Sequence, residues 1–278
     1  MGRFDGKVVL VTGGARGQGR SHALAFAREG ADIAICDIAD QLDTVPYAMS
    51  AQADLDRTVE LVEELDRRCV AVRADVRDRA QVEQFAERAR AELGRIDVLL
   101  ANAGIFSFGT VAEMSEDMWQ QMIAVNLTGV YHAFRAVLPT MIEQGYGRIV
   151  ATSSMAGKVG MGNIAHYVAA KWGVIGLVKS TAIEVGGNGI TVNAVCPTSV
   201  DTDMIQNAAA YELFLPDTPH PTRDDAAPAF QSMNTVPVPW VEVSDISNTM
   251  LFLASDDARY ITGETVAVAA GMNTGNAA

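Results

Sequence analysis

Short apolar segments alternate along the chain with longer segments whose apolar residues recur every three or four positions. The short segments have the length of strands, and strands that are apolar throughout are typical of a parallel sheet covered on both faces. We predict strands at 7–12, 32–36, 69–75, 96–104, 147–154, 189–197 and 264–270. Seven strands separated by helical segments predict an α/β fold with a parallel sheet.

The longer segments have the spacing of helices. Val59, Val62 and Leu65, for example, would lie on one helix face. Predicted helices cover 17–30, 54–65, 79–94, 115–144, 164–186 and 242–255. Right-handed crossovers would place them on both faces of the sheet. No linker rich in glycine, serine or proline divides the chain, so we expect a single doubly wound domain over residues 1–278.

Two stretches interrupt this alternation. The segment at about 38–56 follows the second strand and is longer than most strand–helix connections. Its apolar residues suggest that it packs over a bound ligand, although a plain surface insertion is the alternative. The region from Pro197 to Trp240 contains seven of the nine prolines, and we predict that it is irregular, with about 200–240 forming a lid over a substrate site.

Composition and charge narrow the function classes. Apolar residues make up 49% of the chain, which is typical of a folded protein, and the net charge is −13. So acidic a chain is poorly suited to nucleic acid or to anionic membranes. No apolar run is long enough for a transmembrane helix. Three cysteines in or beside predicted strands indicate buried thiols in a cytoplasmic protein, and no metal-ligand cluster is evident.

A glycine-rich loop, TGGARGQG at 12–19, lies directly between the first strand and the first helix. Glycines allow backbone amides to approach a pyrophosphate at the positive end of the helix dipole. Asp37 ends the second strand, where a carboxylate accepts hydrogen bonds from ribose hydroxyls and repels a 2′-phosphate. Ile38 offers no positive charge to such a phosphate. Arg16 could do so, but Asp37 favours NAD over NADP.

The sequence YVAAK places Tyr167 and Lys171 on one face of a helix. An ammonium beside a phenol is expected to lower the phenol's pKa, which would make Tyr167 a proton acceptor for an alcohol or a donor to a carbonyl. The alternative is a packed tyrosine beside an exposed lysine. His166 points to another helix face than Lys171, so we expect it to have a packing or surface role.

These motifs, together with NAG at 102–104, Asn126 in AVNLTG, and Ser154, resemble the classical short-chain dehydrogenase/reductase family in order and spacing, over residues 5 to about 272. The resemblance implies a Rossmann fold and catalysis by Asn126, Ser154, Tyr167 and Lys171. Ser154 would bind the substrate oxygen, Tyr167 would transfer the proton, Lys171 would bind the nicotinamide ribose, and Asn126 would hold a water of the proton relay.

The same resemblance assigns the cofactor contacts. Asp75 and Val76 would touch the adenine, residues 102–104 would form the turn beside the adenosine ribose, and the segment CPTSVDTDM would close over the nicotinamide. Thr198 stands where the family usually has glycine, which leaves the local turn geometry open. The full set implied to bind NAD is Gly13, Arg16, Gly17, Gln18, Gly19, Asp37, Ile38, Asp75, Val76, Asn102, Ala103, Gly104, Tyr167, Lys171, Pro197, Val200 and Thr202.

Three segments resemble a narrower branch, the mycofactocin-coupled dehydrogenases that include actinobacterial carveol dehydrogenases. They are GQGRSHA at 17–23, the insertion after the second strand, and CPTSVDTDM at 196–204. This resemblance implies oxidation of a secondary, often terpenoid, alcohol to a ketone. It also implies a tightly bound NAD that is recycled through the mycofactocin redox system. Members of the short-chain dehydrogenase/reductase family are commonly homotetramers, so the resemblance implies a homotetramer as well.

An apolar substrate is consistent with the apolar side chains expected around the mouth of the site. They are Met155, Met161, Met204, Tyr211, Phe214, Met233 and Trp240. Packing of a surface loop on the core is the alternative for this set. Three other functions remain open: an ordinary dehydrogenase that releases NADH, a non-catalytic NAD-binding regulator, and a methyltransferase, although the last would not need Ser154, Tyr167 and Lys171.

Overall fold

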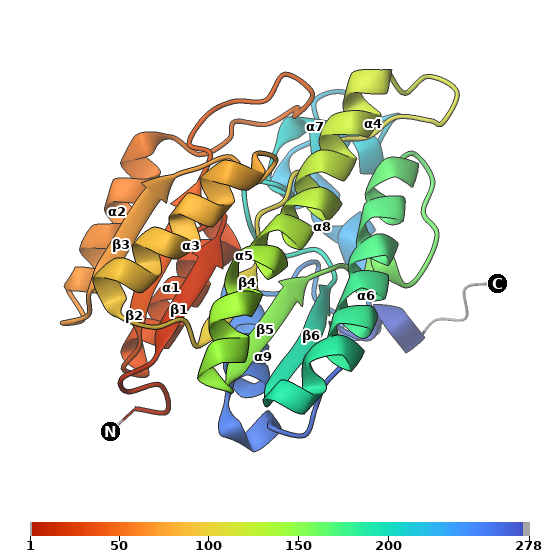
Figure 1. The fold of residues 1–278 in the computed structure, drawn as a ribbon. Helices are drawn as coiled ribbons and strands as arrows, with labels where there is room; N and C mark the ends of the chain where they lie inside the picture. Colours follow the sequence, from red (N-terminus) through yellow and green to blue (C-terminus); the bar gives the residue numbers. More distant parts are fainter. Residues whose placement is uncertain (1, 275–278) are drawn as a thin grey trace.

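The computed structural model describes residues 2–274, which form a seven-stranded parallel sheet with helices on both faces (Figure 1). The strand order is β3-β2-β1-β4-β5-β6-β7. This confirms the predicted doubly wound α/β fold. The strands are β1 Val8–Thr12, β2 Asp32–Asp37, β3 Cys69–Arg73, β4 Val98–Ala101, β5 Gly147–Thr152, β6 Ile190–Pro197 and β7 Thr265–Val268.

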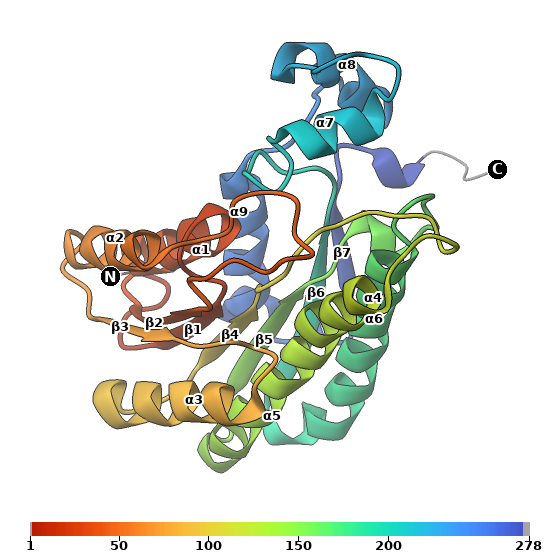
Figure 2. The same ribbon diagram turned by 90° about the horizontal axis from the view of Figure 1, so that it is seen from above.

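The helices lie in two layers, with α1, α2 and α9 on one face of the sheet and α3, α5 and α6 on the other (Figure 2). The α-helices are α1 Gly17–Arg28, α2 Gln52–Glu63, α3 Arg79–Leu93, α4 Glu116–Ile123, α5 Gly129–Gln144, α6 Ala165–Val185, α7 Ala208–Phe214, α8 Arg223–Ser232 and α9 Val243–Ala254. Single turns of 3-10 helix occur at Met155–Gly157, Gly186–Asn188, Asp256–Ala258 and Met272–Thr274.

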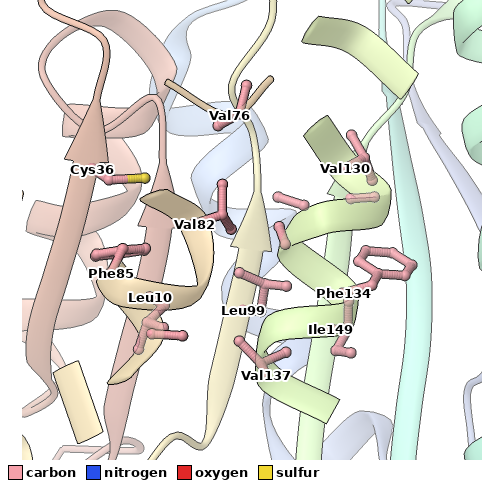
Figure 3. Packing of buried hydrophobic residues seen from close by; sticks show 14 of the residues in the cluster. Leu10, Cys36, Val76, Val82, Phe85, Leu99, Val130, Phe134, Val137 and Ile149 are labelled. Atoms are coloured by element: carbon pink, nitrogen blue, oxygen red, sulfur yellow. The ribbon is translucent and has the colours of Figure 1, made fainter. Parts of the chain in front are cut away.

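Each strand contributes side chains to two separate cores because successive residues point to opposite faces. In β1, Val8 and Leu10 join the core under α3, α5 and α6, whereas Val9 and Val11 join the core under α1 and α9. Figure 3 shows Leu10 and its neighbours meeting the side chains of α3 and α5. This burial on both faces explains the continuously apolar strands.

The predicted helix at 115–144 is two helices joined by a π-helical turn, Ala124–Thr128, which contains Asn126. Such turns widen a helix locally and are frequent at functional sites. The insertion is shorter than predicted, since α2 begins at Gln52 and only residues 38–51 are irregular.

The prediction that residues 197–240 are irregular was wrong in part, because α7 and α8 lie within them, at one edge of the molecule (Figure 2). The proline content of this region does not prevent helix formation. Helix α8 contains Pro228 but begins with a capping box, in which Thr222 and Asp225 each bond the other's backbone amide. Its Phe230 is fully buried, so packing and capping outweigh the bond that proline removes.

The order of connections reverses between β1 and β4, which both lie inside the sheet. Crossovers leave these two strands in opposite directions, so a crevice opens at their carboxyl ends, where ligands of such sheets bind. The three cysteines are free thiols, with Cys36 and Cys196 buried and Cys69 partly so. In residues 2–274, no helix is long and apolar enough to cross a bilayer, and no cluster of three potential metal ligands occurs.

Candidate active site

The loop between β1 and α1 has the backbone that its glycines predict. Gly13 and Gly17 have φ angles of +69° and +54°, which side chains other than glycine rarely adopt. A Cβ on Gly19 would overlap the carbonyl oxygen of Gly13. Glycine at these positions therefore lets the loop turn sharply and brings the start of α1 against the end of β1.

The start of α1 has the properties of a phosphate site. No side chain caps its first backbone amides, which therefore point unblocked toward the crevice. The crevice contains a groove of about 150 Å³. Thirteen of the predicted cofactor residues line it: Gly13, Arg16, Gly17, Gln18, Gly19, Asp37, Ile38, Asp75, Val76, Asn102, Ala103, Gly104 and Thr202. The groove thus suits a dinucleotide.

Asp37 lies at the end of this groove, where the adenosine ribose was predicted. One carboxylate oxygen accepts a hydrogen bond from the Ala15 amide at 3.1 Å. The other accepts one from the Ser50 hydroxyl at 2.6 Å and one from the Ala39 amide at 3.2 Å. These bonds hold the carboxylate in the groove wall, where it would repel a 2′-phosphate. Ser50, in the insertion, was not predicted.

Asn102 joins the ends of three adjacent strands. Its side-chain amide donates to the Thr12 carbonyl at 3.1 Å, and its side-chain oxygen lies 3.4 Å from the Thr152 hydroxyl. The Thr12 hydroxyl in turn accepts hydrogen bonds from the amides of Asn102 and Ala103 at 3.0 and 3.1 Å. The turn at 102–104 is therefore rigid, and Thr12, which was not predicted, positions it.

Segment 38–51 connects the end of β2 to the start of α2 (Figure 1). Leu42 and Val45 are buried in the core, and Leu42, Tyr47, Met49 and Ser50 line the groove. The Thr44 hydroxyl donates to the side-chain oxygen of Gln121 in α4 at 2.9 Å. The segment is therefore fixed to the body of the protein, and its apolar residues Leu42, Tyr47 and Met49 face the groove; that it packs over a bound ligand stays a prediction.

Arg16 connects both sides of the groove. Its guanidinium donates to the carbonyl oxygen of Ala48 in segment 38–51 and forms a 2.9 Å ion pair with Asp203. Asp203 belongs to the segment that follows β6, and it too lines the groove. This link was not predicted from sequence, because the three residues come from distant parts of the chain.

A second cavity, of about 350 Å³, adjoins the groove and shares six lining residues with it. Ser154, Tyr167 and Lys171 line this cavity, as do Pro197 and Val200, so the last two lie beside the predicted catalytic residues. Thr202 lines both spaces and donates to the Val200 carbonyl at 3.3 Å. The structure thus brings Ser154, Tyr167 and Lys171 together in the cavity that adjoins the groove.

Apolar side chains form most of the cavity wall. Five of the seven predicted residues line it, namely Met155, Met161, Met204, Phe214 and Met233. The prediction was wrong for Tyr211 and Trp240, which pack in a small core formed by α7 and α8. Additional apolar residues, missed in the sequence, are Phe106, Ile164, Ile205, Leu213 and Met272.

Lys171 is almost completely buried, and its ammonium donates to the Thr152 carbonyl at 2.8 Å. Burial lowers the pKa of Lys171 to about 8. The ammonium lies 5.5 Å from the centre of the Tyr167 ring. Lys171 is therefore anchored to β5 and held beside the phenol.

The pKa of Tyr167 was predicted to fall, but burial raises it to about 12. A hydrogen bond from Ser154 opposes this effect without overcoming it. The prediction was wrong because it counted the attraction of Lys171 and omitted the cost of an anion in an apolar cavity. The protein alone keeps Tyr167 protonated near neutral pH, so ionisation needs additional positive charge in the site.

Asn126 is fully buried in the π-helical turn and holds the chain after β4. Its oxygen accepts from the Ile105 amide and its nitrogen donates to the Ile105 carbonyl, both at 2.8 Å. It lies close to Gly104 and thus near Lys171. Its predicted role in holding a water stays a prediction, whereas the structure gives it a direct role in positioning Ile105.

His166 has the packing role that was expected. It is fully buried, its Nε2 lies 3.0 Å from the Ser107 hydroxyl, and burial lowers its pKa. Thr198 adopts no left-handed backbone. Its hydroxyl lies 3.2 Å from the Asn234 side-chain oxygen, so replacing glycine here adds a link to the lid region without disturbing the turn.

Comparison with known proteins agrees with this geometry. The family model described as short chain dehydrogenase matches residues 7–212. A (-)-trans-carveol dehydrogenase of Rhodococcus erythropolis is 45% identical over 98% of this chain and 99% of its own length. A carveol dehydrogenase of Mycobacterium avium, solved in complex with NAD, is 46% identical with a TM-score of 0.97, over 99% of this chain and 100% of that one.

A short chain dehydrogenase of Mycobacterium paratuberculosis, solved with NAD, is 34% identical with a TM-score of 0.90, over 99% of this chain and 100% of that one. The likeness therefore extends over the whole sheet and both spaces of the site. The chain belongs to the short-chain dehydrogenase/reductase family of oxidoreductases, close to its carveol dehydrogenases.

Proposed function

We propose that this protein is an NAD-dependent dehydrogenase that oxidises an apolar secondary alcohol to a ketone. The observation that carries the proposal is the placement of Ser154, Tyr167 and Lys171 in an apolar cavity that adjoins the dinucleotide groove. The relatives solved with NAD support the cofactor, and Asp37 supports NAD over NADP.

Each catalytic side chain has a definite task in this proposal. Bound NAD would accept the hydride from the alcohol carbon and bring the positive charge that favours a phenolate. Tyr167 takes the hydroxyl proton at its phenol oxygen, and Ser154 holds the substrate oxygen beside it. Lys171 binds the nicotinamide ribose and keeps a positive charge near the phenol, while Asn126 holds the adjoining chain and a water of the proton relay.

A terpenoid-like substrate agrees with the cavity wall. Methionine side chains are flexible and fit irregular apolar shapes, and five of them line the cavity together with Phe106 and Phe214. Two relatives are named carveol dehydrogenases, after a cyclic terpenoid alcohol. Residues 200–240 would act as the lid, because α7 and the segment before it form one side of the cavity.

The attachment of segment 38–51 supports slow exchange of NAD. Its buried Leu42 and Val45, the Ser50–Asp37 bond, and the link from Arg16 to Ala48 hold it along the groove. A retained cofactor would have to be reoxidised in place, which is the basis for proposing the mycofactocin redox system as partner. A freely exchanging NAD(H) is the alternative within the same reaction.

The cellular compartment and the oligomeric state of the protein can be proposed as well. Three free thiols suit the reducing cytoplasm. A homotetramer is supported by large apolar side chains on the outer face of α6, where Trp172 and Ile183 are exposed. We propose that the whole chain forms one domain that assembles through this face.

Mass spectrometry and nicotinamide absorbance on freshly purified protein, before and after exhaustive dialysis, test the proposal. Retained NAD, with carveol oxidation only when an artificial electron acceptor is added, would support a tightly bound cofactor and in-place recycling. Protein that loses NAD on dialysis and cycles on added NAD would support the exchanging dehydrogenase. Lack of oxidation of any secondary alcohol, with NAD bound, would favour a regulator.

A further inference from the structure

The chain that follows β4 is held by three polar contacts from three different elements. Asn126 in the π-helical turn bonds both backbone groups of Ile105 at 2.8 Å. His166 in α6 lies 3.0 Å from the hydroxyl of Ser107. Phe106 lies between Ile105 and Ser107 in the sequence, and its amide donates to the Tyr47 hydroxyl at 3.2 Å. Tyr47 belongs to segment 38–51.

Phe106 connects this contact to the proposed catalytic tyrosine. Its ring meets the Tyr167 ring edge to face, with centroids 5.1 Å apart and an interplanar angle of 86°. Phe106 lines the substrate cavity, whereas Tyr47 lines the cofactor groove. The two phenols are also close enough for the charge of one to influence the pKa of the other. A continuous path therefore runs from the groove to Tyr167.

We propose that Tyr47 is a positioning residue that links segment 38–51 to proton transfer, because its hydroxyl holds Phe106 against Tyr167. The inference rests on the proposed role of Tyr167. It adds that the segment along the cofactor groove also aligns the catalytic phenol, so that this segment contributes to turnover and not only to cofactor retention.

The chemistry of the Tyr47 hydroxyl suits this task. Burial raises the pKa of Tyr47 far above the ordinary value for a phenol, so the group stays neutral. Its oxygen accepts from Phe106, and its own proton has no acceptor within residues 2–274. Since Tyr47 lines the groove, that proton is available to a bound dinucleotide. One hydroxyl can thus bond the cofactor and the Phe106 backbone at once.

Tyr47→Phe tests the link because it removes only the hydroxyl. The Phe106 amide would lose its acceptor, and a partly buried amide left unpaired is unfavourable enough to loosen its chain. We expect the rate of bound-nicotinamide reduction, measured in a single turnover at saturating carveol and NAD, to fall about threefold to tenfold. The carveol concentration for half-maximal rate should change less than twofold. Tyr260→Phe, at an 87% exposed site, is the matched control.

A double-mutant cycle separates alignment from general damage. Phe106→Leu removes the ring that contacts Tyr167 and keeps an apolar side chain. If Tyr47 acts through that ring, Tyr47→Phe should have little further effect in the Phe106→Leu background. The inference would be overturned if the two substitutions lowered the rate independently, so that their fold-losses multiplied in the double variant. It would also be overturned if the Tyr47→Phe rate lay within twofold of the parent rate.

Two further measurements distinguish failure of this inference from cofactor loss and from failure of the proposed role of Tyr167. Mass spectrometry of NAD after dialysis shows whether Tyr47→Phe acts through cofactor loss. A variant that loses NAD while its single-turnover rate at saturating NAD is unchanged would contradict the inference, but it would be consistent with the proposed role of segment 38–51 in retaining NAD. Tyr167→Phe tests the proposed role of Tyr167 itself. If that variant keeps its rate, the proposed role of Tyr167 fails, and the inference that rests on it fails as well, whatever the cycle shows; lack of alcohol oxidation by the parent would instead contradict the proposed function.

Discussion

Tyr167 is surrounded by groups that have opposite effects on its ionisation. Burial raises its pKa to about 12, while the hydrogen bond from Ser154 lowers it. Lys171 is itself made less basic by burial. A phenol in this setting stays protonated near neutral pH. We therefore expect proton uptake from an alcohol to depend on additional positive charge, such as that of an oxidised nicotinamide.

Replacing this phenol should abolish turnover and leave binding intact. Tyr167→Phe keeps the ring that packs on Phe106 but cannot exchange a proton. We expect kcat for alcohol oxidation to fall by about 100- to 10,000-fold, the usual contribution of general acid–base catalysis. Steady-state kinetics measures the loss, and mass spectrometry should find the NAD content unchanged. A loss below about tenfold would show that another group transfers the proton.

At the scale of elements, α1 and α9 are joined by a polar contact inside the core. His22 of α1 is fully buried, and its Nδ1 lies 2.8 Å from the Ser247 hydroxyl of α9. Ser21 reaches the same hydroxyl at 2.8 Å. Burial lowers the pKa of His22 to about 3. The helix that begins at the phosphate loop is thus fixed by a neutral imidazole.

This contact predicts a loss of stability in acid. Between about pH 6.5 and 3, the unfolded chain binds a proton at His22 that the folded protein does not bind, so the free energy of unfolding falls as the pH falls. His22 should contribute a slope of about 1.4 kcal/mol per pH unit there.

Chemical denaturation at several pH values should give a shallower slope for His22→Asn than for the parent. His220→Asn removes an exposed imidazole at a position whose left-handed backbone asparagine tolerates, and it serves as the control. Equal slopes for the parent and His22→Asn would contradict the assignment.

Segment 38–51 is a second element with a distinct test. Val45 is buried and does not line the groove. Val45→Ser would weaken the attachment of the segment to the core without changing a cofactor contact. We expect NAD to dissociate about tenfold faster, as a loss of about 1.4 kcal/mol of attachment implies. Dissociation is followed by dilution into a trap for free NAD.

The control for this experiment is Val111→Ser, because Val111 is 77% exposed and lies outside the segment. Its NAD should dissociate at the parent rate. An unchanged rate in Val45→Ser, with the segment's attachment weakened as judged by faster proteolysis, would show that segment 38–51 does not retain the cofactor.

At the scale of the whole molecule, apolar side chains on the outer face of α6 predict assembly. Ile183 is 85% exposed, and Trp172 is exposed on the same helix. Ile183→Glu would place a charge in an interface formed there, which is costly to bury. Light scattering should show a tetramer for the parent and smaller species for the variant. Val111→Glu adds the same charge elsewhere, and a tetramer in both variants would exclude this face.

Much of the fold follows from local patterns in the sequence. Each strand is buried on both faces and is therefore apolar throughout, as β1 shows, and the glycines of the phosphate loop are required by the local backbone. The prediction failed where tertiary packing competes with composition. Residues 200–240 form two helices despite their prolines, because Phe230 is buried and Thr222 caps α8.

The sequence by itself determined the order of strands and helices, the phosphate loop, Asp37, and the set Ser154, Tyr167 and Lys171, because these depend on short-range spacing and residue type. Only the tertiary structure decided which distant groups meet. It placed Arg16 between Ala48 and Asp203, brought Tyr47 to Phe106, and buried Tyr167 enough to raise its pKa. Burial and contacts between remote segments depend on how the whole chain packs, so no local pattern reveals them.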